Sequence, residues 1–341
     1  MSQPSFTTPM PLDNCTTPNQ EVYTALASVM IGQFALGLPL NLSVLYIFIF
    51  RYKFWKNKSI FLFNIVVADF LLVACLPVQA HHYLQGYRRS TNQAECKIMQ
   101  FMLFLNRGAS IFFLITLSLD RYFNVVHLGK RNCVKFMKKS PQISVVIWLL
   151  LLPLFIPTMV IDCCNSHGRY NETFNSNLKD TFREIVFFTE IIVPFLILVF
   201  CTVRIVHRLK RKTVGDKTKL RRAVFVVMSV VFVFSFCFLP CAIARAALLV
   251  VRINNELKTE DVVVQVYDSL VVLSYFDCLL DPVVYCFCNT GFKKAYISKF
   301  CPPFLKEKLL NADFGMGTTT VTTTTTNSAG RIISTPLTGS K

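Results

Sequence analysis

The chain is poor in charged residues. Only 16% of its 341 residues are Asp, Glu, Lys or Arg, whereas 53% are hydrophobic and the mean hydropathy is +0.48. A soluble protein this apolar would aggregate, so the composition predicts a polytopic membrane protein. Acidic residues are scarcest, with 19 against 36 basic ones and a net charge of +17. Such an excess could indicate nucleic-acid binding, but the basic residues lie in short connections between apolar segments, where they set membrane orientation instead.

Motifs of several other membrane proteins are also missing from the sequence. It has neither Gly-x-Gly-Asp, as in intramembrane aspartyl proteases, nor His-Glu-x-x-His, so we expect no enzymatic activity. The last apolar span has no lysine that could hold retinal. A polytopic transporter or channel, the alternative from a different class, would require inverted repeats or a polar stripe along several helices, and neither is evident.

Seven apolar spans are present, each long enough at about 20 residues to cross a bilayer as a helix. They are 22–50, 60–80, 98–122, 143–161, 185–206, 223–251 and 262–288. The connections 51–59, 121–142 and 203–222 hold 4, 6 and 9 Lys plus Arg, whereas 81–95, 160–184 and 251–261 hold 2, 3 and 2. By the positive-inside rule, the amino terminus lies outside the cell and the carboxyl terminus lies in the cytoplasm.

We therefore expect an all-α protein, a seven-transmembrane helix bundle at 22–288. Residues 1–21 would form an extracellular tail, 289–301 a short amphipathic helix on the membrane surface, and 302–341 a disordered cytoplasmic tail. We expect no cleavable signal peptide, so that the first helix directs insertion. The glycosylation sequons at Asn14 and Asn171 both fall on the outer side.

Four of the 13 cysteines fall outside the membrane on that side, where disulfides form and persist: Cys15, Cys96, Cys163 and Cys164. The adjacent Cys163 and Cys164 would need a strained ring to join each other. We expect Cys96 to pair with one of these two and Cys15 with the other, while a free Cys15 stays an alternative. The cysteines expected to be small apolar packing residues are Cys75, Cys201, Cys237, Cys241 and Cys278.

Charged residues inside apolar spans are costly in lipid and are usually functional. Arg107 lies eleven residues past Cys96, which is roughly 16 Å deep at about 1.5 Å per residue. A guanidinium at that depth cannot reach the surface and needs an anion. A ligand is one source of that anion, and an internal ion pair with Asp277 or Glu190 is the alternative.

Each apolar span carries a few polar, cysteine, tryptophan or proline positions, and their order along the chain and their register within the spans form a recognisable pattern. They are Asn41, Val67-Ala68-Asp69, Cys96, Asp120-Arg121-Tyr122, Trp148, Pro194, Cys237-Phe238-Leu239-Pro240 and Asp281-Pro282 to Tyr285. This pattern resembles the rhodopsin-like (class A) G-protein-coupled receptors over residues 20–301. The sequence departs from that family at Val67, where Leu is more frequent, at Leu128, where Pro is usual, and at Phe238, where Trp is more common.

The resemblance implies a buried polar network of Asn41, Asp69, Asp277 and Asp281 that holds a sodium ion, although a purely structural network is an equal alternative. Two carboxylates stand where the family more often has Asn, and they favour a bound cation or a shared proton.

The resemblance also implies a switch at the cytoplasmic side, in which Arg121 pairs with Asp120 at rest and is released when helix 6 moves outward. Pro194, Pro240 and Pro282 would allow kinks. The residues expected to carry activation are Asp120, Arg121, Tyr122, Phe238, Pro240, Asp281, Pro282 and Tyr285.

Within this family, Leu105-Asn106-Arg107 with Ser110-Ile111, and Arg245 five positions past Pro240, look most like the hydroxycarboxylic acid receptors, with the oxoeicosanoid receptor as a sibling. The likeness implies an anionic ligand, a hydroxycarboxylic acid or an oxidised fatty acid. Two guanidiniums suit a carboxylate because Arg binds it bidentately. The residues expected to line the ligand site are Arg107, Arg245, Tyr275, His81, His82 and Ser166. A nucleotide or peptide is the alternative anionic ligand.

The subfamily likeness implies coupling to an inhibitory G protein at the cytoplasmic side. The basic connection 203–222 could meet that protein or anionic lipid. Cys301 is a candidate for palmitoylation, and phosphorylated threonines at 318–326 could recruit arrestin.

Overall fold

The computed structural model describes residues 15–51, 60–126, 140–156, 174–211, 217–254, 257–288, 290–300, 325–326 and 332–333. The chain divides into two units, Met1–Lys293 and Lys294–Lys341. The first unit holds the helix bundle.

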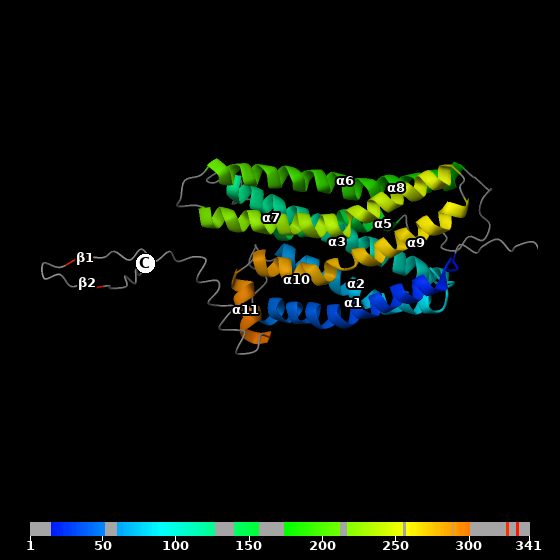
Figure 1. Ribbon diagram of the computed structural model, residues 1–341, viewed down its shortest axis with the longest axis horizontal. Coiled ribbons are helices and arrows are strands. Elements are labelled where there is room, and N and C mark those ends of the chain that lie inside the picture. Colours follow the sequence, from blue (N-terminus) through cyan, green and yellow to red (C-terminus); the bar gives the residue numbers. More distant parts are fainter. Residues whose placement is uncertain are drawn as a thin grey trace, which may run out of the picture. The chain divides into compact units, whose positions relative to one another are not determined.

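The helices of the bundle run side by side (Figure 1). They are α1 (Gln20–Tyr46), continued by the π-helix η1 (Ile47–Arg51), α2 (Ile60–Leu84), α3 (Gln93–Val126), α5 (Ser140–Phe155), α6 (Phe174–Arg211), α7 (Lys217–Cys237), α8 (Leu239–Ile253), α9 (Leu257–Ser274) and α10 (Asp277–Cys288); α11 (Thr290–Phe300) follows. Since α7 with α8, and α9 with α10, each make one interrupted membrane helix, these elements correspond to the seven predicted spans.

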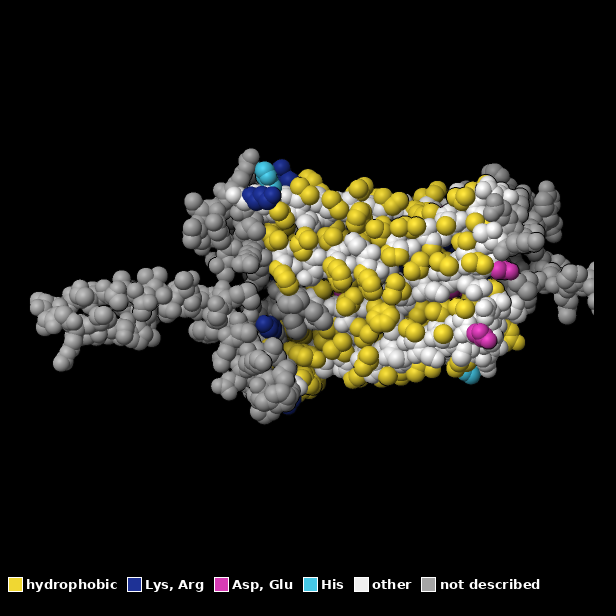
Figure 2. Space-filling view, viewed as in Figure 1, with side chains coloured by type: hydrophobic (Ala, Val, Ile, Leu, Met, Phe, Trp, Pro, Cys, Tyr) yellow, Lys and Arg dark blue, Asp and Glu magenta, His cyan; other side chains and the backbone are white. Residues whose placement is uncertain are grey.

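Six helical stretches of the described ranges are long and apolar enough to cross a membrane, and α5 is a shorter apolar helix. Their outward side chains are hydrophobic: Leu36, Leu149 and Phe232 are all more than 60% exposed. Figure 2 shows hydrophobic side chains covering the visible flank of the bundle, with basic groups at the end where α6 stops and α7 starts and acidic groups at the opposite end. So much exposed apolar surface would not persist in water but suits contact with lipid.

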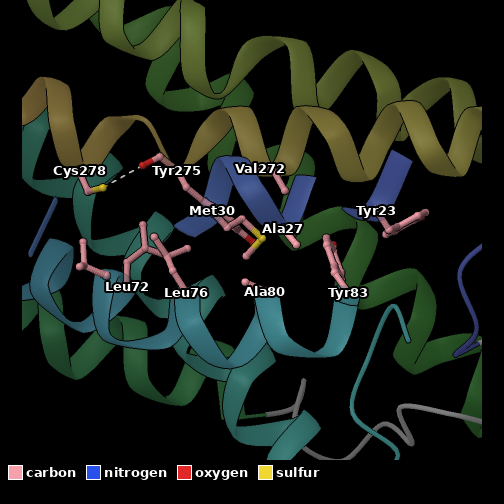
Figure 3. Close-up of a cluster of buried hydrophobic side chains, with 11 residues drawn as sticks. Tyr23, Ala27, Met30, Leu72, Leu76, Ala80, Tyr83, Val272, Tyr275 and Cys278 are labelled. Carbon is pink, nitrogen blue, oxygen red and sulfur yellow. Dashed lines mark hydrogen bonds between the residues drawn. The ribbon is translucent and has the colours of Figure 1, made fainter. Parts of the chain in front are cut away.

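The inner faces of α1, α2 and α9 pack into a cluster that includes Tyr23, Met30 and Leu76 (Figure 3). Gly37 lets α1 approach α2 closely, because a Cβ atom there would lie 3.1 Å from Cγ2 of Val73. Small residues serve this purpose in membrane bundles, where packing rather than water exclusion holds helices together.

Two breaks interrupt the bundle's helices. The first is at Phe238, where α8 begins with Pro240 in its first turn; proline lacks the N–H that would continue the helix from α7. The sequence predicted this hinge. The second break is at Tyr275 and Phe276, between α9 and α10, whereas Pro282 lies inside α10. The sequence motif predicted a kink at Pro282 and gave no sign of the break before it.

In the second unit, the strands β1 (Thr325–Thr326) and β2 (Ile332–Ile333) pair antiparallel. Apart from these four residues, the tail 302–341 lies outside the described residues, so its expected disorder stays a prediction. Thr and Ile are β-branched residues, which favour extended backbone.

Candidate ligand-binding site

A cavity of about 150 Å³ lies among α2, α3, α6, α8 and α9. Among the described residues, its lining includes five arginines and three residues with carboxylates, Glu184, Asp268 and Asp277. The arginines are Arg88, Arg89, Arg107, Arg183 and Arg245. The cavity is therefore a cationic chamber, and the contacts of each arginine decide which one is available to a ligand.

Arg107 on α3 is 9% exposed and is held between aromatic rings. Its guanidinium carbon lies 5.1 Å from the ring centre of Phe104 and 4.8 Å from that of Phe187. Its Nε makes no hydrogen bond, and it forms no salt bridge with any residue that the structure describes. The rings stabilise the charge, but the hydrogen-bonding capacity of Nε is unused.

Glu190 on α6 is the acid that acts most strongly on Arg107, yet the two form no salt bridge. It is 4% exposed, and neither carboxylate oxygen has a hydrogen-bond partner within the described ranges. Gly108 makes room for it, because a Cβ atom there would lie 2.8 Å from Oε1 of Glu190. Asp277 accepts a hydrogen bond from its neighbour Cys278 N, at 2.7 Å, instead of reaching Arg107.

Arg245 on α8 is already paired with a carboxylate. Its Nε donates to Oε2 of Glu184 at 3.0 Å, and its Nη2 donates to Oε1 of the same group. The guanidinium also stacks 5.3 Å from the ring centre of Tyr267. Arg183 contributes a further contact to Glu184 Oε1, at 3.4 Å. Arg245 thus lines the cavity as predicted, but its fork is occupied by a protein acid.

Arg88 is likewise paired, at the outer edge of the cavity. Its Nε and Nη2 donate to the two oxygens of Asp268 on α9, at 2.6 and 3.0 Å, and the Tyr23 hydroxyl donates to the same carboxylate at 2.6 Å. Burial disfavours the guanidinium charge, but Asp268 raises the pKa of Arg88 above its ordinary value. Burial and the adjacent charge of Arg88 lower the pKa of Arg89 to about 10.

The backbone of this outer loop is tied to the amino-terminal segment. Arg88 N donates to Cys15 O at 2.7 Å, and Thr17 N donates to Gly86 O at 2.9 Å. Gly86 has a φ of 84°, which favours glycine. Cys15 and Cys96 are both disulfide-bonded. Their predicted partners Cys163 and Cys164 lie outside the described residues, as do Asn14, Asn171, Ser166 and Cys301.

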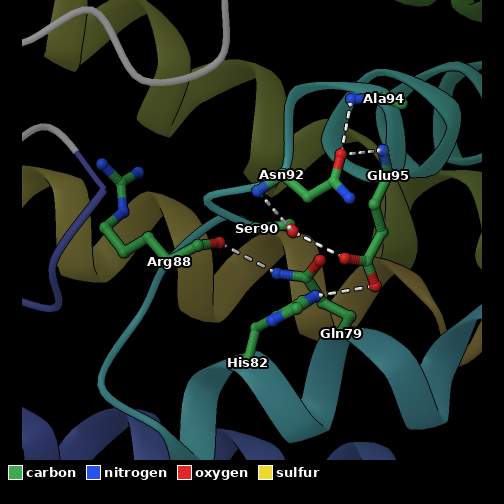
Figure 4. Close-up of polar contacts among 7 residues, drawn as sticks. All are labelled: Gln79, His82, Arg88, Ser90, Asn92, Ala94 and Glu95. Carbon is green, nitrogen blue, oxygen red and sulfur yellow. Dashed lines mark hydrogen bonds and ion pairs between the residues drawn. The ribbon is translucent and has the colours of Figure 1, made fainter.

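The two histidines of α2 differ in position. His82 is buried and lines the cavity, with its Nε2 3.2 Å from Oε1 of Glu95, while Ser90 donates to Oε2 of that carboxylate at 2.7 Å (Figure 4). His81 is exposed and does not line the cavity. Of the two histidines that the sequence predicted to line the ligand site, His82 lines this cavity and His81 does not.

Tyr275 and Phe238, at the two helix breaks, close the inner side of the cavity. Both are buried. The carbonyl of Tyr275 accepts a hydrogen bond from the Cys278 thiol at 2.9 Å (Figure 3), but its hydroxyl makes no hydrogen bond to another described residue. The Phe238 ring packs 5.5 Å from that of Phe234. Both helix breaks therefore border the cavity.

The model of the 7 transmembrane receptor (rhodopsin family) matches residues 40–285. The chain belongs to this receptor family. It is also 31% identical over 290 residues to the mouse (Mus musculus) 12-(S)-hydroxy-5,8,10,14-eicosatetraenoic acid receptor, which covers 83% of this chain and 91% of the relative.

Two human (Homo sapiens) receptors show a comparable similarity. Hydroxycarboxylic acid receptor 2 is 33% identical over 288 residues, covering 82% of this chain and 78% of the relative. Oxoeicosanoid receptor 1 is 30% identical over 280 residues, covering 81% and 72%. The chain is thus a multi-pass plasma-membrane receptor of the hydroxycarboxylic acid and oxoeicosanoid receptor group, whose partners are a small-molecule ligand and a G protein.

Below the cavity, the receptor buries a polar cluster. Asn41, Asp69, Asp277 and Asp281 are all fully buried. Asn41 Nδ2 donates to the carbonyls of Gly37 and Cys278, both at 3.0 Å, and both oxygens of Asp281 lack a hydrogen-bond partner. In the ranges that the structure describes, no group of three or more His, Cys, Asp or Glu is arranged to hold a metal ion. A sodium ion or a shared proton at this cluster stays a prediction.

At the cytoplasmic side of the receptor, Asp120 is buried and Arg121 is half-buried. The Tyr122 ring packs against Cys201, Ile205 and Val227, which joins α3 to α6 and α7. Pro282 is buried within α10, whereas the side chain of Tyr285 lies outside the described part of the structure. Cys75, Cys201, Cys237, Cys241 and Cys278 are free thiols, which confirms that they are not disulfide cysteines.

Several site residues were not predicted from the sequence. Glu184, Tyr267, Arg88 and Asp268 were not identified as site residues, although an acid such as Asp268 within an apolar span is the same signal that drew attention to Arg107. The two arginines of the first outer loop were counted only toward orientation. Phe104 and Phe187 carried no signal, since aromatic residues are frequent throughout the spans.

Proposed function

We propose that this receptor is activated by a carboxylic acid whose carboxylate is bound by Arg107, and that it signals through an inhibitory G protein. The observation that carries the proposal is the buried guanidinium of Arg107, which has no carboxylate partner among the described residues while Arg88 and Arg245 both have one. A buried charge of this kind is stabilised most by an anion that binds it directly.

The shape and chemistry of the cavity support a small acid. Its volume of about 150 Å³ is below the roughly 300 to 1,000 Å³ of pockets for drug-sized ligands. Tyr275 offers a hydroxyl beside the arginine, and Leu103 and Phe104 offer apolar surface for a short chain. An oxidised fatty acid is the second candidate, because two of the relatives are named for eicosanoid ligands.

In this proposal, binding is coupled to signalling through the helix breaks. Phe238, after which α8 begins, lines the same cavity as Arg107, so an acid bound there would act next to this break. A ligand that binds one hinge conformation more tightly shifts the population toward it. At the other end of the same membrane helix, α7 packs on Tyr122 beside Arg121, where the G protein would bind.

The proposal is tested by measuring G-protein activation by acids of increasing chain length and by their methyl esters, which lack the charge. The acids should activate and the esters should not. Arg107→Ala should lower acid potency by about 30-fold or more, since losing a buried charge pair costs on the order of 2 to 5 kcal/mol. Arg107→Lys should recover little, because an ammonium lacks the planar fork.

Surface level is measured beside each response, so that misfolding is not taken for lost binding. Unchanged acid potency of Arg107→Ala at normal surface level would contradict the binding role of Arg107. A response that survives pertussis toxin would contradict the inhibitory coupling alone.

A further inference from the structure

The Glu184–Arg245 pair has the geometry of a bound ligand acid. The two carboxylate oxygens of Glu184 accept from Nε and Nη2 of Arg245 on the facing helix, with side-chain exposures of 16% and 12%. This two-point contact is the one that an arginine makes with any planar carboxylate. Glu184 therefore already takes the place on Arg245 that a ligand carboxylate would need.

Neighbouring groups hold Glu184 in that place. Arg183 donates to its Oε1 at 3.4 Å, and Tyr267 covers one face of the Arg245 guanidinium at 5.3 Å. A second ligand carboxylate would have to expel Glu184 from Arg245 and would meet its negative charge. Breaking a buried pair leaves an uncompensated charge, so that exchange is unfavourable.

We propose that Glu184 is a specificity-determining residue that masks Arg245 and restricts the cavity to acids with a single carboxylate. The inference rests on the proposed function, in which Arg107 binds that carboxylate. It extends the proposed function by specifying the charge of the ligand. The cavity accepts an acid with one carboxylate and rejects an acid with a carboxylate at each end.

The test compares acids of equal chain length with one or two carboxylates, such as butyrate with succinate and hexanoate with adipate. In the unmodified receptor, each monocarboxylate should be the more potent by at least about 10-fold. Glu184→Gln keeps the size of the side chain but removes its charge, so it should raise the potency of the dicarboxylates at least about 10-fold relative to their monocarboxylate partners.

The matched control is the double variant Glu184→Gln with Arg245→Gln, which removes both charges of the pair. The gain for dicarboxylates should disappear in it, because no unmasked guanidinium is left to bind the second carboxylate. A gain that persists in the double variant would overturn the role of Arg245. No relative gain in Glu184→Gln at normal surface level would overturn the masking role of Glu184.

If Glu184→Gln fails to reach the cell surface, the ranking in the unmodified receptor decides: dicarboxylates that equal or exceed the monocarboxylates overturn the proposal. The experiments distinguish a failure of the masking role of Glu184 from a failure of the proposed function. Loss of acid responses in Arg107→Ala without the predicted ranking rejects only the masking role, whereas unaltered responses in Arg107→Ala reject the binding role on which it rests.

Discussion

The outer and inner arginines of the cavity are held in different ways. At the outer edge, Arg88 and Arg245 are each clamped by both oxygens of an acid, Asp268 and Glu184. Further in, Arg107 is flanked by the rings of Phe104 and Phe187 and has no such acid among the described residues. The outer pairs tie the first outer loop to α9 and α6 to α8, whereas the inner arginine is left able to bind an anion.

Energetics explain why this difference can persist. Cation–π contacts contribute about 0.5 to 2 kcal/mol each, which offsets part of the cost of burying the Arg107 guanidinium while its Nε has no hydrogen-bond partner. A carboxylate partner would stabilise it more but would have to be displaced by a ligand. Glu190 on α6 attracts Arg107 electrostatically but forms no hydrogen bond with it. A ligand carboxylate could therefore bind Arg107 without first displacing a protein carboxylate.

The largest effect on stability is expected from a variant that breaks one of the outer ion pairs. Asp268→Asn should destabilise the receptor by about 3 to 5 kcal/mol, because it leaves the Arg88 guanidinium without its counter-ion. The melting temperature in detergent and the surface level should both fall. Arg88→Gln combined with Asp268→Asn should recover much of the loss, since the double variant leaves neither charge unpaired. An Asp268→Asn receptor as stable as the unmodified one would show that this pair does not hold α9.

A smaller effect, on ligand potency, is expected from a variant at the inner side of the cavity. Tyr275→Phe should lower carboxylic acid potency by about 2- to 10-fold, the consequence of losing one hydrogen bond of about 0.5 to 1.5 kcal/mol to the ligand. Its melting temperature without ligand should stay unchanged, because the hydroxyl has no hydrogen-bond partner in the described bundle. A drop in that melting temperature would mean that the hydroxyl is structural.

Much of the fold was accessible from the sequence because lipid imposes a simple rule. Spans of about 20 apolar residues gave the helices, and the basic connections gave their orientation. Arg107 was found for the same reason, as a charge where lipid forbids one. The hinge at Phe238 was predicted from Pro240, whose missing N–H is visible in the sequence itself.

The partners of the arginines could not be predicted, because pairing depends on which helix faces meet. Arg245 and Glu184 are 61 positions apart, and Arg88 and Asp268 are 180 apart. Without those contacts, Arg245 looked like a second ligand anchor. The break at Tyr275 and Phe276 was also missed, since it has no proline or glycine within it.

The central claim is that Arg107 binds the ligand and Arg245 does not. The most direct test measures the potency of one monocarboxylic acid at Arg107→Gln and at the double variant Glu184→Gln with Arg245→Gln, each at matched surface level. Both remove a cavity arginine, but the double variant leaves no buried charge unpaired. We expect a loss of about 30-fold or more for Arg107→Gln and less than about 3-fold for the double variant. Equal losses, or a larger loss in the double variant, would contradict the distinction between the two arginines.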